Sequence, residues 1–427
     1  MQRALRSSAL TVVGFGAMQG IRLVSNLILT RLLFPDVFGL MALIMVMIQG
    51  LNNFSDVGIT PAILQSRRGD DQTFLDTAFT MQAIRGVMLW LGCCILAVPA
   101  ARFYDVPELV WYLPVAGFTA VIYGVMSTKM ESANRHLRMG RMTLVEVLST
   151  AASTIVTVIL AALMNSAWAL VIGLILGAII KVVMVARMLP GKPNRFRWDR
   201  DAVAELMRFG KWILPSTVVG FAIAQGDKAV LARYLSLSEL GVYNIAFFLA
   251  SFPLMLGNTI ISRLMIPIYR TTSEEPTPRR LHRVRIMRAG LTASFLLLLA
   301  IFAASGSHLV ALMYDARYQD AGGMVTLIAL ASIPALIGLS YDQAALAAGD
   351  SRGFFWVTLV RAVLFLSFFM IGARQGGIEG ALLGQALAAI LAYPMLIRIA
   401  RRHGAWDGLH DLFFGLLGLA LTAWLLS

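Results

Sequence analysis

Segments of about 20 apolar residues recur along the whole chain, separated by short polar stretches. Each segment is long enough to cross the ~30 Å hydrocarbon layer of a bilayer as an α-helix. A helix also satisfies its own backbone hydrogen bonds in lipid, which an open strand cannot do. Of the 427 residues, 58% are hydrophobic, well above the average for soluble proteins. The sequence therefore predicts an all-α polytopic membrane protein.

The apolar pattern predicts twelve helices and one further hydrophobic segment that begins at Leu409. The basic start MQRALRSS leads into an apolar run that has no small-residue cleavage site, so we interpret it as the first transmembrane helix rather than a signal peptide. The predicted ranges are 9–31, 38–64, 78–100, 110–128, 143–163, 167–187, 212–234, 242–267, 289–313, 323–348, 354–373 and 378–398.

The lysines and arginines lie mainly in every second loop. Twenty-five are in or beside the predicted loops of one side, including 188–211 and 268–288, and five lie on the opposite side. Because positive loops stay in the cytoplasm, the N-terminus is predicted to be cytoplasmic. This distribution also accounts for the net charge of +13 without a nucleic-acid partner. The six remaining cations fall inside predicted helices: Arg22, Arg85, Lys181, Lys228, Arg263 and Arg361.

Two segments about two hundred residues apart are nearly the same. Residues 11–22 read TVVGFGAMQGIR and residues 217–228 read TVVGFAIAQGDK. RLLFPDVFGL (31–40) resembles RYLSLSELGV (233–242), and TLVEVL (143–148) resembles TLVRAV (358–363). An internal duplication fits these matches, and because six helices form each half, both halves enter the membrane from the same side as parallel repeats.

The duplication predicts two six-helix lobes related by a pseudo-two-fold axis along the membrane normal. The lobes are expected over 1–187 and 212–400, with a cytoplasmic linker over 188–211 and an extra hydrophobic segment in 401–427. Whether residues 405–427 cross the membrane is left open, because a thirteenth span would place the C-terminus on the outer side.

Several stretches resemble a known transporter family. TRLLFPDVFGLMAL, FSDVGITPAILQSR, ARFYDVPEL and ANRHLRMGRM are similar to the polysaccharide-transport branch of the multidrug/oligosaccharidyl-lipid/polysaccharide exporter superfamily. The resemblance implies an oligosaccharide flippase of the bacterial cytoplasmic (inner) membrane. Its substrate would be an undecaprenyl-pyrophosphate-linked oligosaccharide for O-antigen, capsule or exopolysaccharide, moved by alternating access through a cavity between the lobes. Polysaccharide polymerase machinery is a further implied partner.

Polar residues on the repeated helices are the candidate substrate site. Gln19, Arg22 and Asn26 are spaced to share one face of the first helix, and Gln225 and Lys228 repeat this spacing on the seventh. Under the pseudo-two-fold axis, Arg22 and Lys228 would face each other across one cavity and bind a pyrophosphate, since cations bind phosphate oxygens strongly. Arg85 and Arg361 lie in the cytoplasmic halves of their helices and are candidates to line the entrance.

Ion pairing is the alternative for each of these cations. Asp56 could pair with Arg85, Asp342 with Arg361, and Asp227 is adjacent to Lys228. Asp227 and Glu146 are also candidates to carry a coupling proton or sodium ion. No cofactor or metal site is predicted, and Cys93 and Cys94 lie inside an apolar run as small filling residues.

Two other functions compete with the flippase. A cation-coupled multidrug exporter of the same superfamily would favour acidic residues in the membrane, whereas here six cations face four acids, Asp56, Glu146, Asp227 and Asp342. A membrane glycan polymerase would need a sizeable external loop with catalytic side chains, and the external loops have about ten residues or fewer. The chain is therefore predicted to be a transporter and not an enzyme.

Overall fold

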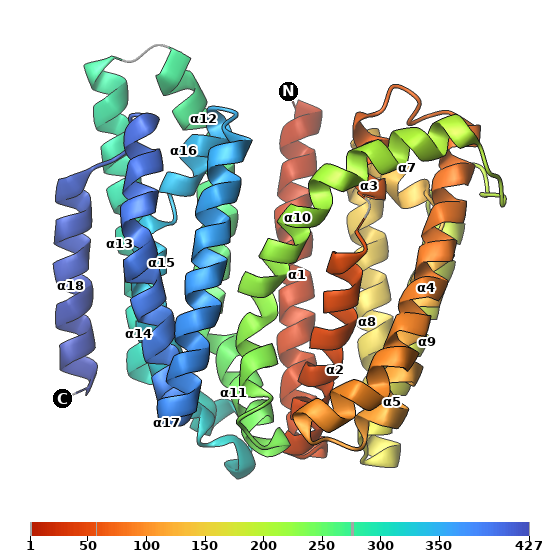
Figure 1. The fold of residues 1–427 in the computed structure, drawn as a ribbon, viewed down its shortest axis with the longest axis horizontal. Coiled ribbons are helices and arrows are strands. Elements are labelled where there is room, and N and C mark those ends of the chain that lie inside the picture. The colour runs from red at the N-terminus through yellow and green to blue at the C-terminus, as the bar shows by residue number, and fades with distance from the viewer. Residues whose placement is uncertain (1, 57, 275–276, 427) are drawn as a thin grey trace. The chain divides into compact units, whose positions relative to one another are not determined.

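A computed structural model describes residues 2–56, 58–274 and 277–426, with the side chains of 2–12, 15, 209–212 and 271–274 excluded. Every regular element in these ranges is a helix (Figure 1). The all-α prediction is thus confirmed. The chain divides into two compact units, Met1–Phe221 and Ala222–Ser427. The predicted linker lies inside the first unit, while the division into two six-helix lobes stays a prediction.

The first unit contains nine complete helices and the start of α10. α1 (Gln2–Leu32) is followed by α2 (Pro35–Phe54), α3 (Ile59–Gln65), α4 (Gln72–Tyr104), α5 (Leu109–Gly117), α6 (Thr119–Gly124), α7 (Lys129–Arg135), α8 (Met139–Met164), α9 (Ala167–Met188) and α10 (Arg200–Leu231). The predicted helix 38–64 is broken between α2 and α3. Gly58 adopts a φ of 62°, which glycine tolerates best, and its amide donates to Asp56 Oδ1 at 2.9 Å.

The linker before α10 is attached to the first unit by side-chain hydrogen bonds. Asn194 Oδ1 accepts from Ser127 Oγ at 2.8 Å, and Asn194 Nδ2 donates to Thr128 Oγ1 at 2.8 Å. The amide of Arg197 donates to Thr80 Oγ1 at 2.9 Å. Figure 1 shows the start of α10 lying over α3, where Leu206 is fully buried in a small apolar cluster. The linker therefore has a fixed path on this unit.

The second unit contains the rest of α10 and the remaining helices. These are α11 (Leu237–Ala250), α12 (Phe252–Glu274), α13 (Pro278–Met313), α14 (Ala321–Ala331), α15 (Ile333–Gly338), α16 (Tyr341–Ala347), α17 (Ser351–Arg402) and α18 (Gly408–Leu426), with a short 3-10 turn at Ala316–Tyr318. The predicted helix 323–348 is divided into α14, α15 and α16. An apolar core cluster of the second unit joins α12, α13, α14, α15, α16, α17 and α18.

Helix α17 includes a sharp turn and combines two predicted helices, 354–373 and 378–398. Gly376 and Gly377 have non-helical backbone angles, and Gly377 has a φ of 57°. On either side of the turn, a side chain on Gly372 or Gly380 would collide with the backbone of the other residue. The two arms are consequently a closely packed hairpin with glycine at the contact.

Corresponding short helices occur in the two units. α7 and α16 each have seven residues, and each precedes a long helix, α8 or α17. α7 contacts α3 and α8, and α16 contacts α12 and α17. A left-handed residue follows two positions after the end of each short helix, Leu137 at a φ of 54° and Gly349 at 72°. The two units thus share a short helix before a long one, a feature that apolar periodicity does not reveal.

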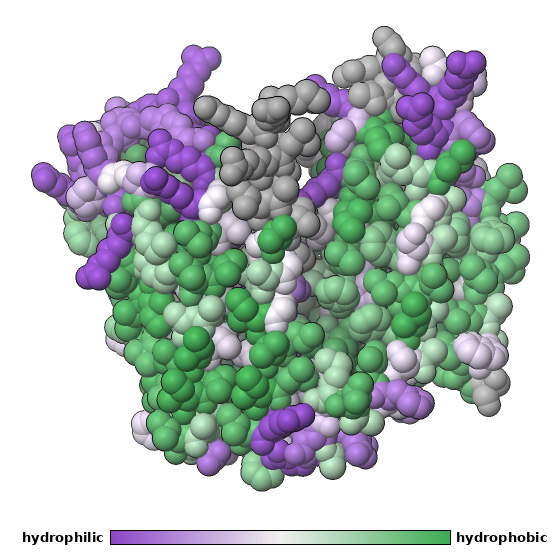
Figure 2. Space-filling model, turned by 180° about the vertical axis from the view of Figure 1, so that it is seen from behind, coloured by the Kyte–Doolittle hydropathy of each residue, from purple (hydrophilic) through white to green (hydrophobic). Residues whose placement is uncertain are grey.

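The apolar helices fit a membrane environment. In the described ranges nine helices are long and apolar enough to cross a bilayer, or ten if the bent pair 109–124 and 129–135 forms one span. α17 counts once among them, and α18 is included. On the visible face of each unit, apolar residues cover the middle and hydrophilic residues gather at the ends (Figure 2). The protein is therefore a multi-pass membrane protein.

Arg288 is not a loop cation, although it falls at the end of the predicted loop 268–288. It lies inside α13 and is only 2% exposed. Its Nη1 donates to the Tyr341 hydroxyl at 3.3 Å, and the same hydroxyl donates to Asp411 Oδ1 of α18 at 2.6 Å. This buried chain of polar groups fixes α18 to the second unit.

Candidate functional site

A polar cavity of about 640 Å³ lies inside the first unit. Its wall is formed by residues of α1, α2, α3, α4, α6, α7 and α9 and of the segments after α2 and α6. Its polar lining residues are Arg22, Gln49, Asn52, Asp56, Thr60, Gln82, Arg85, Thr119, Tyr123 and Glu131. Two of the predicted substrate-binding cations, Arg22 and Arg85, therefore share one cavity.

Arg22 is the more accessible of these two cations. It lies in the last third of α1 and its side chain is exposed on the cavity wall. Among the described residues it forms neither an ion pair nor a hydrogen bond. The predicted alternative of a paired aspartate is thus not found for Arg22 in this part of the chain. A guanidinium in this position can donate two parallel hydrogen bonds to an anionic ligand.

Arg85 is held against α2 by hydrogen bonds. Its Nη2 donates to the carbonyl oxygen of Asn52 at 2.6 Å, and its Nε donates to Ser55 Oγ at 3.1 Å. The predicted ion pair with Asp56 does not form in the described structure. Neither contact neutralises the guanidinium charge. Arg85 is therefore a positively charged group held in a fixed position on the cavity wall.

A smaller cavity of about 280 Å³ lies inside the second unit. Leucine, isoleucine, phenylalanine and alanine side chains make up most of its wall, together with Asp227, Asp342 and Arg361. Arg361 Nη1 donates to Asp342 Oδ2 at 2.6 Å, and the two side chains are 27% and 14% exposed. The predicted ion pair between these two residues is therefore confirmed, and the only cation on this wall among the described residues has its counter-ion.

Asp227 and Lys228 have different surroundings although they are adjacent on α10. Asp227 is 3% exposed and its Oδ2 accepts from the Tyr243 hydroxyl at 2.9 Å. The other oxygen, Oδ1, has no hydrogen-bond partner within the described structure. Lys228 Nζ lies 5.0 Å from the centre of the Phe247 ring, a cation–π contact. No ion pair between the two is formed in the described residues.

The remaining predicted residues lie outside both cavity walls. Gln19 and Asn26 are half-buried on α1, Gln225 is half-buried on α10, and Glu146 is half-buried on α8. Asn26 Oδ1 is buried and has no partner among the described residues. The facing of Arg22 and Lys228 stays a prediction, as does a coupling role for Asp227 or Glu146.

The sequence does not predict Glu131 or the uncharged polar residues of the cavity wall, among them Asn52 and Gln82. Glu131 falls between the predicted helices 110–128 and 143–163, close to Lys129 and Arg135, but the structure places it on α7, where it is 8% exposed. Only the comparison of α7 with α16 could have indicated it, since the third residue of α16 is Gln343, also buried.

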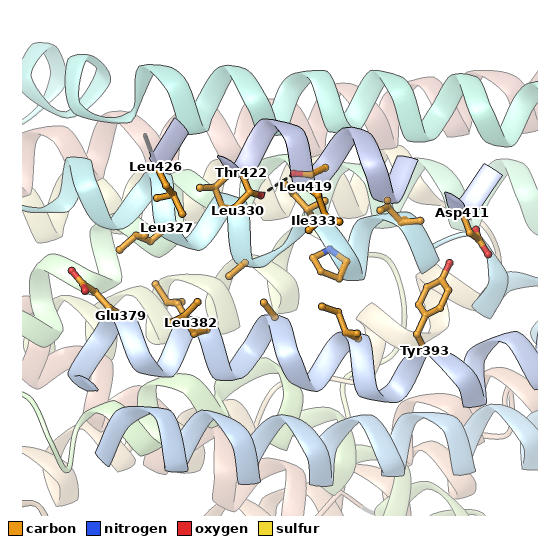
Figure 3. Close-up of a pocket in the computed structure, with 18 of the residues that line it drawn as sticks. Leu327, Leu330, Ile333, Glu379, Leu382, Tyr393, Asp411, Leu419, Thr422 and Leu426 are labelled. Atoms are coloured by element: carbon orange, nitrogen blue, oxygen red, sulfur yellow. Dashed lines mark hydrogen bonds between the residues drawn. The ribbon is translucent and has the colours of Figure 1, made fainter. Parts of the chain in front are cut away.

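A third cavity of about 480 Å³ lies between α14, α15, α17 and α18 (Figure 3). Glu379 lies at one end, and Tyr393 and Asp411 lie at the other. Between them the wall is formed mainly by leucine and other apolar side chains. Its surface suits a hydrocarbon rather than a charged group.

The arrangement of helices is that of known membrane transporters. A solved structure titled "Lipid II flippase MurJ, inward closed conformation" matches with a TM-score of 0.69 at 10% identity, covering 99% of this chain and 98% of that one. An inward-facing multidrug resistance MATE family transporter of the MOP superfamily matches with a TM-score of 0.66 at 15% identity, covering 91% and 96%. At these identities the likeness establishes the fold.

Curated relatives give more specific likenesses. The succinoglycan biosynthesis transport protein ExoT of Rhizobium meliloti (strain 1021) is 23% identical over 85% of this chain and 73% of its own length. The lipopolysaccharide biosynthesis protein WzxC of Escherichia coli (strain K12) is 21% identical over 89% and 78%. The family described as "Polysaccharide biosynthesis protein" matches residues 28–347. The chain belongs to this family, and the resemblance noted in the sequence is confirmed.

Proposed function

We propose that this protein is a flippase that carries a lipid-linked oligosaccharide across the membrane for surface polysaccharide synthesis. The observation that carries the proposal is the polar cavity of the first unit, with Arg22 and Arg85 on its wall. The family membership and the relatives named for succinoglycan transport and lipopolysaccharide biosynthesis support the substrate class.

The chemistry of the cavity suits a diphosphate and the first sugars. A lipid diphosphate diester carries two negative charges, which two guanidinium groups without carboxylate partners in the described structure can bind by charge-assisted hydrogen bonds. Gln82 and Asn52, on the same wall, offer amide groups to sugar hydroxyls. We propose undecaprenyl pyrophosphate as the lipid carrier, because a long isoprenoid can stay in the bilayer while the charged group enters the cavity.

The transport cycle would be alternating access between two lobes. Lys228, Gln225, Gln19 and Asn26 would then contact the substrate from the two repeated helices, and Arg361 would lie near the entrance. A proton or sodium gradient could drive the cycle through Asp227 or Glu146. The proposed location is the bacterial inner membrane with a cytoplasmic N-terminus, near the polysaccharide polymerase machinery.

Flipping can be measured with the purified protein in liposomes. A lipid diphosphate oligosaccharide is placed in the bilayer, and its appearance on the opposite leaflet is followed with a membrane-impermeant lectin. The double variant Arg22→Ala/Arg85→Ala is expected to lower the initial rate at least about 100-fold, since each charge-assisted contact contributes about 1.5–3 kcal/mol.

Arg263→Ala is the matched control, because it removes an exposed cation from α12 that lines neither cavity. It should flip substrate at nearly the wild-type rate. A double variant that inserts normally and also flips at that rate would exclude the first-unit cavity as the substrate site.

A further inference from the structure

Glu131 is a buried carboxylate in the wall of the first-unit cavity. It is 8% exposed, and its Oε1 accepts from the Thr60 hydroxyl at a long 3.5 Å. Its Oε2 is buried and has no hydrogen-bond partner in the described part of the chain. A buried carboxylate with so little compensation costs much free energy if it is ionised. The side chain therefore needs a proton or a cation at this position.

The charged groups near α7 do not supply that cation. On α7 itself, Lys129 Nζ donates to the carbonyl oxygen of Ala186 at 2.7 Å, and Arg135 is paired with Asp70 at 3.2 Å. Of the helices packed against α7, α3 has no ionisable side chain, and α8 and α9 carry Arg141, Glu146, Lys181 and Arg187. Across the cavity lie Arg22, Asp56, Arg85 and Tyr123. Within the described ranges none of these groups forms an ion pair or hydrogen bond with Glu131.

The second unit has a neutral side chain at the corresponding place. Gln343 is the third residue of α16 as Glu131 is the third of α7, and Gln343 is 5% exposed with a partnerless Oε1 in the described structure. A glutamine has nearly the shape of a protonated glutamate. The repeated fold thus accommodates an uncharged side chain of this shape at this position.

We propose that Glu131 is a proton-binding site that sets the charge of the first-unit cavity, and that it binds a proton when a diphosphate occupies the cavity. With Arg22, Arg85, Asp56 and Glu131 all ionised, their formal charges cancel. A proton on Glu131 leaves a net charge of +1, which favours an anionic ligand. By linkage, anion binding then favours protonation to the same extent.

This proposal rests on the proposed function, and its test uses binding rather than transport. The probe is a water-soluble short-chain prenyl diphosphate sugar, whose diester phosphates do not titrate between about pH 5.5 and about pH 8.5. Calorimetry with the purified full chain, in two buffers of different ionisation enthalpy, gives the affinity and the number of protons taken up. The wild type is expected to take up a proton on binding and to bind about tenfold more weakly at the alkaline end.

Glu131→Gln reproduces the neutral state and copies the side chain found at Gln343. It should bind the probe with nearly the same affinity at both pH values and without proton uptake. The control Glu108→Gln removes an exposed carboxylate before α5 that does not line the cavity, and it should keep the wild-type proton uptake. Equal proton uptake by Glu131→Gln and the wild type, or no uptake by the wild type, would overturn the proposal. If the wild type fails to bind the probe at any pH, the proposed diphosphate recognition itself fails.

Discussion

The cavities of the two units differ in how their cations are balanced. In the first unit, Arg22 is exposed on the wall and Arg85 is held by a carbonyl and a hydroxyl oxygen, so neither has a carboxylate partner in the described structure. In the second unit, Arg361 forms a 2.6 Å ion pair with Asp342 on a mainly apolar wall. The difference indicates separate roles for the two cavities, because only the cation of the second one is neutralised by a carboxylate in the described structure.

Reversing the charge at Arg22 is expected to have the largest effect. In Arg22→Glu the diphosphate would meet a carboxylate in place of a guanidinium. The binding free energy should weaken by about 4 kcal/mol, which lowers the flipping rate roughly 1000-fold. Arg22→Lys keeps the charge but loses the two-pronged donor, so a loss of about tenfold is expected. If Arg22→Glu retained more than a tenth of the wild-type flipping rate, the first-unit cavity would not be the site that binds the diphosphate.

Breaking the ion pair of the second unit should affect stability. Asp342→Ala leaves the Arg361 guanidinium without a partner in a partly buried site and should lower the free energy of unfolding by about 2 kcal/mol. The double variant Asp342→Ala/Arg361→Met removes both charges and should recover most of that loss. Thermal unfolding in one detergent measures both. If the double variant is no more stable than the single one, the pair does not balance the charge of this cavity.

The linker attachment is specific to the first unit and can be loosened there. Asn194→Ala removes the hydrogen bonds to Ser127 and Thr128, each with a net contribution of about 1 kcal/mol. Hydrogen exchange of the amides in 194–199 should accelerate about 30-fold, since about 2 kcal/mol is lost, while exchange in the second unit stays unchanged. Equal acceleration in both units would mean that the linker stabilises the chain as a whole.

The smallest effect is expected at Asp350, which caps α17 in the second unit. The Gly353 amide donates to its carboxylate at 2.9 Å and His403 lies at 3.0 Å. First the amide and then the histidine lower the pKa of Asp350 below its ordinary value of 3.8. The stabilisation is therefore complete above that value and is lost as the pH falls through the lowered pKa.

Asp350→Asn retains a capping side chain but loses the charge, so it should cost only about 0.5 kcal/mol at neutral pH. The difference from the wild type should disappear in acid, as measured by unfolding over a pH series. A difference that instead grew on acidification would show that the charge of Asp350 destabilises the native state.

The sequence predicts a helix well where its bounds depend only on the length of a continuous apolar segment. The long helices α4, α8 and α9 lie close to their predicted ranges, because lipid requires continuous apolar helices. Breaks inside predicted helices, such as the one at Gly58 between α2 and α3, depend on packing and on local hydrogen bonds. Apolar periodicity contains no signal for them.

The candidate site was predictable only in part. An arginine inside an apolar helix is recognisable as a candidate functional residue, because a charged side chain is energetically costly in lipid. This is how Arg22 and Arg85 were predicted. Glu131 gave no such signal, because its neighbours Lys129 and Arg135 make the segment resemble a cytoplasmic loop. The sequence also does not show which arginine is paired with an aspartate. Asp56 and Asp342 occupy similar positions in the sequence, but in the described structure only Asp342 forms an ion pair with its predicted arginine.

The glycine turn of α17 has a consequence for biosynthesis. With Gly376 and Gly377 at the turn and Gly372 against Gly380, the two arms touch through their backbones with almost no connecting loop. The second arm packs directly on the first through Gly372 and Gly380, so we expect the first arm to reach its final packing only after the second has been synthesised. We therefore expect the two arms of α17 to enter the bilayer together as a helical hairpin.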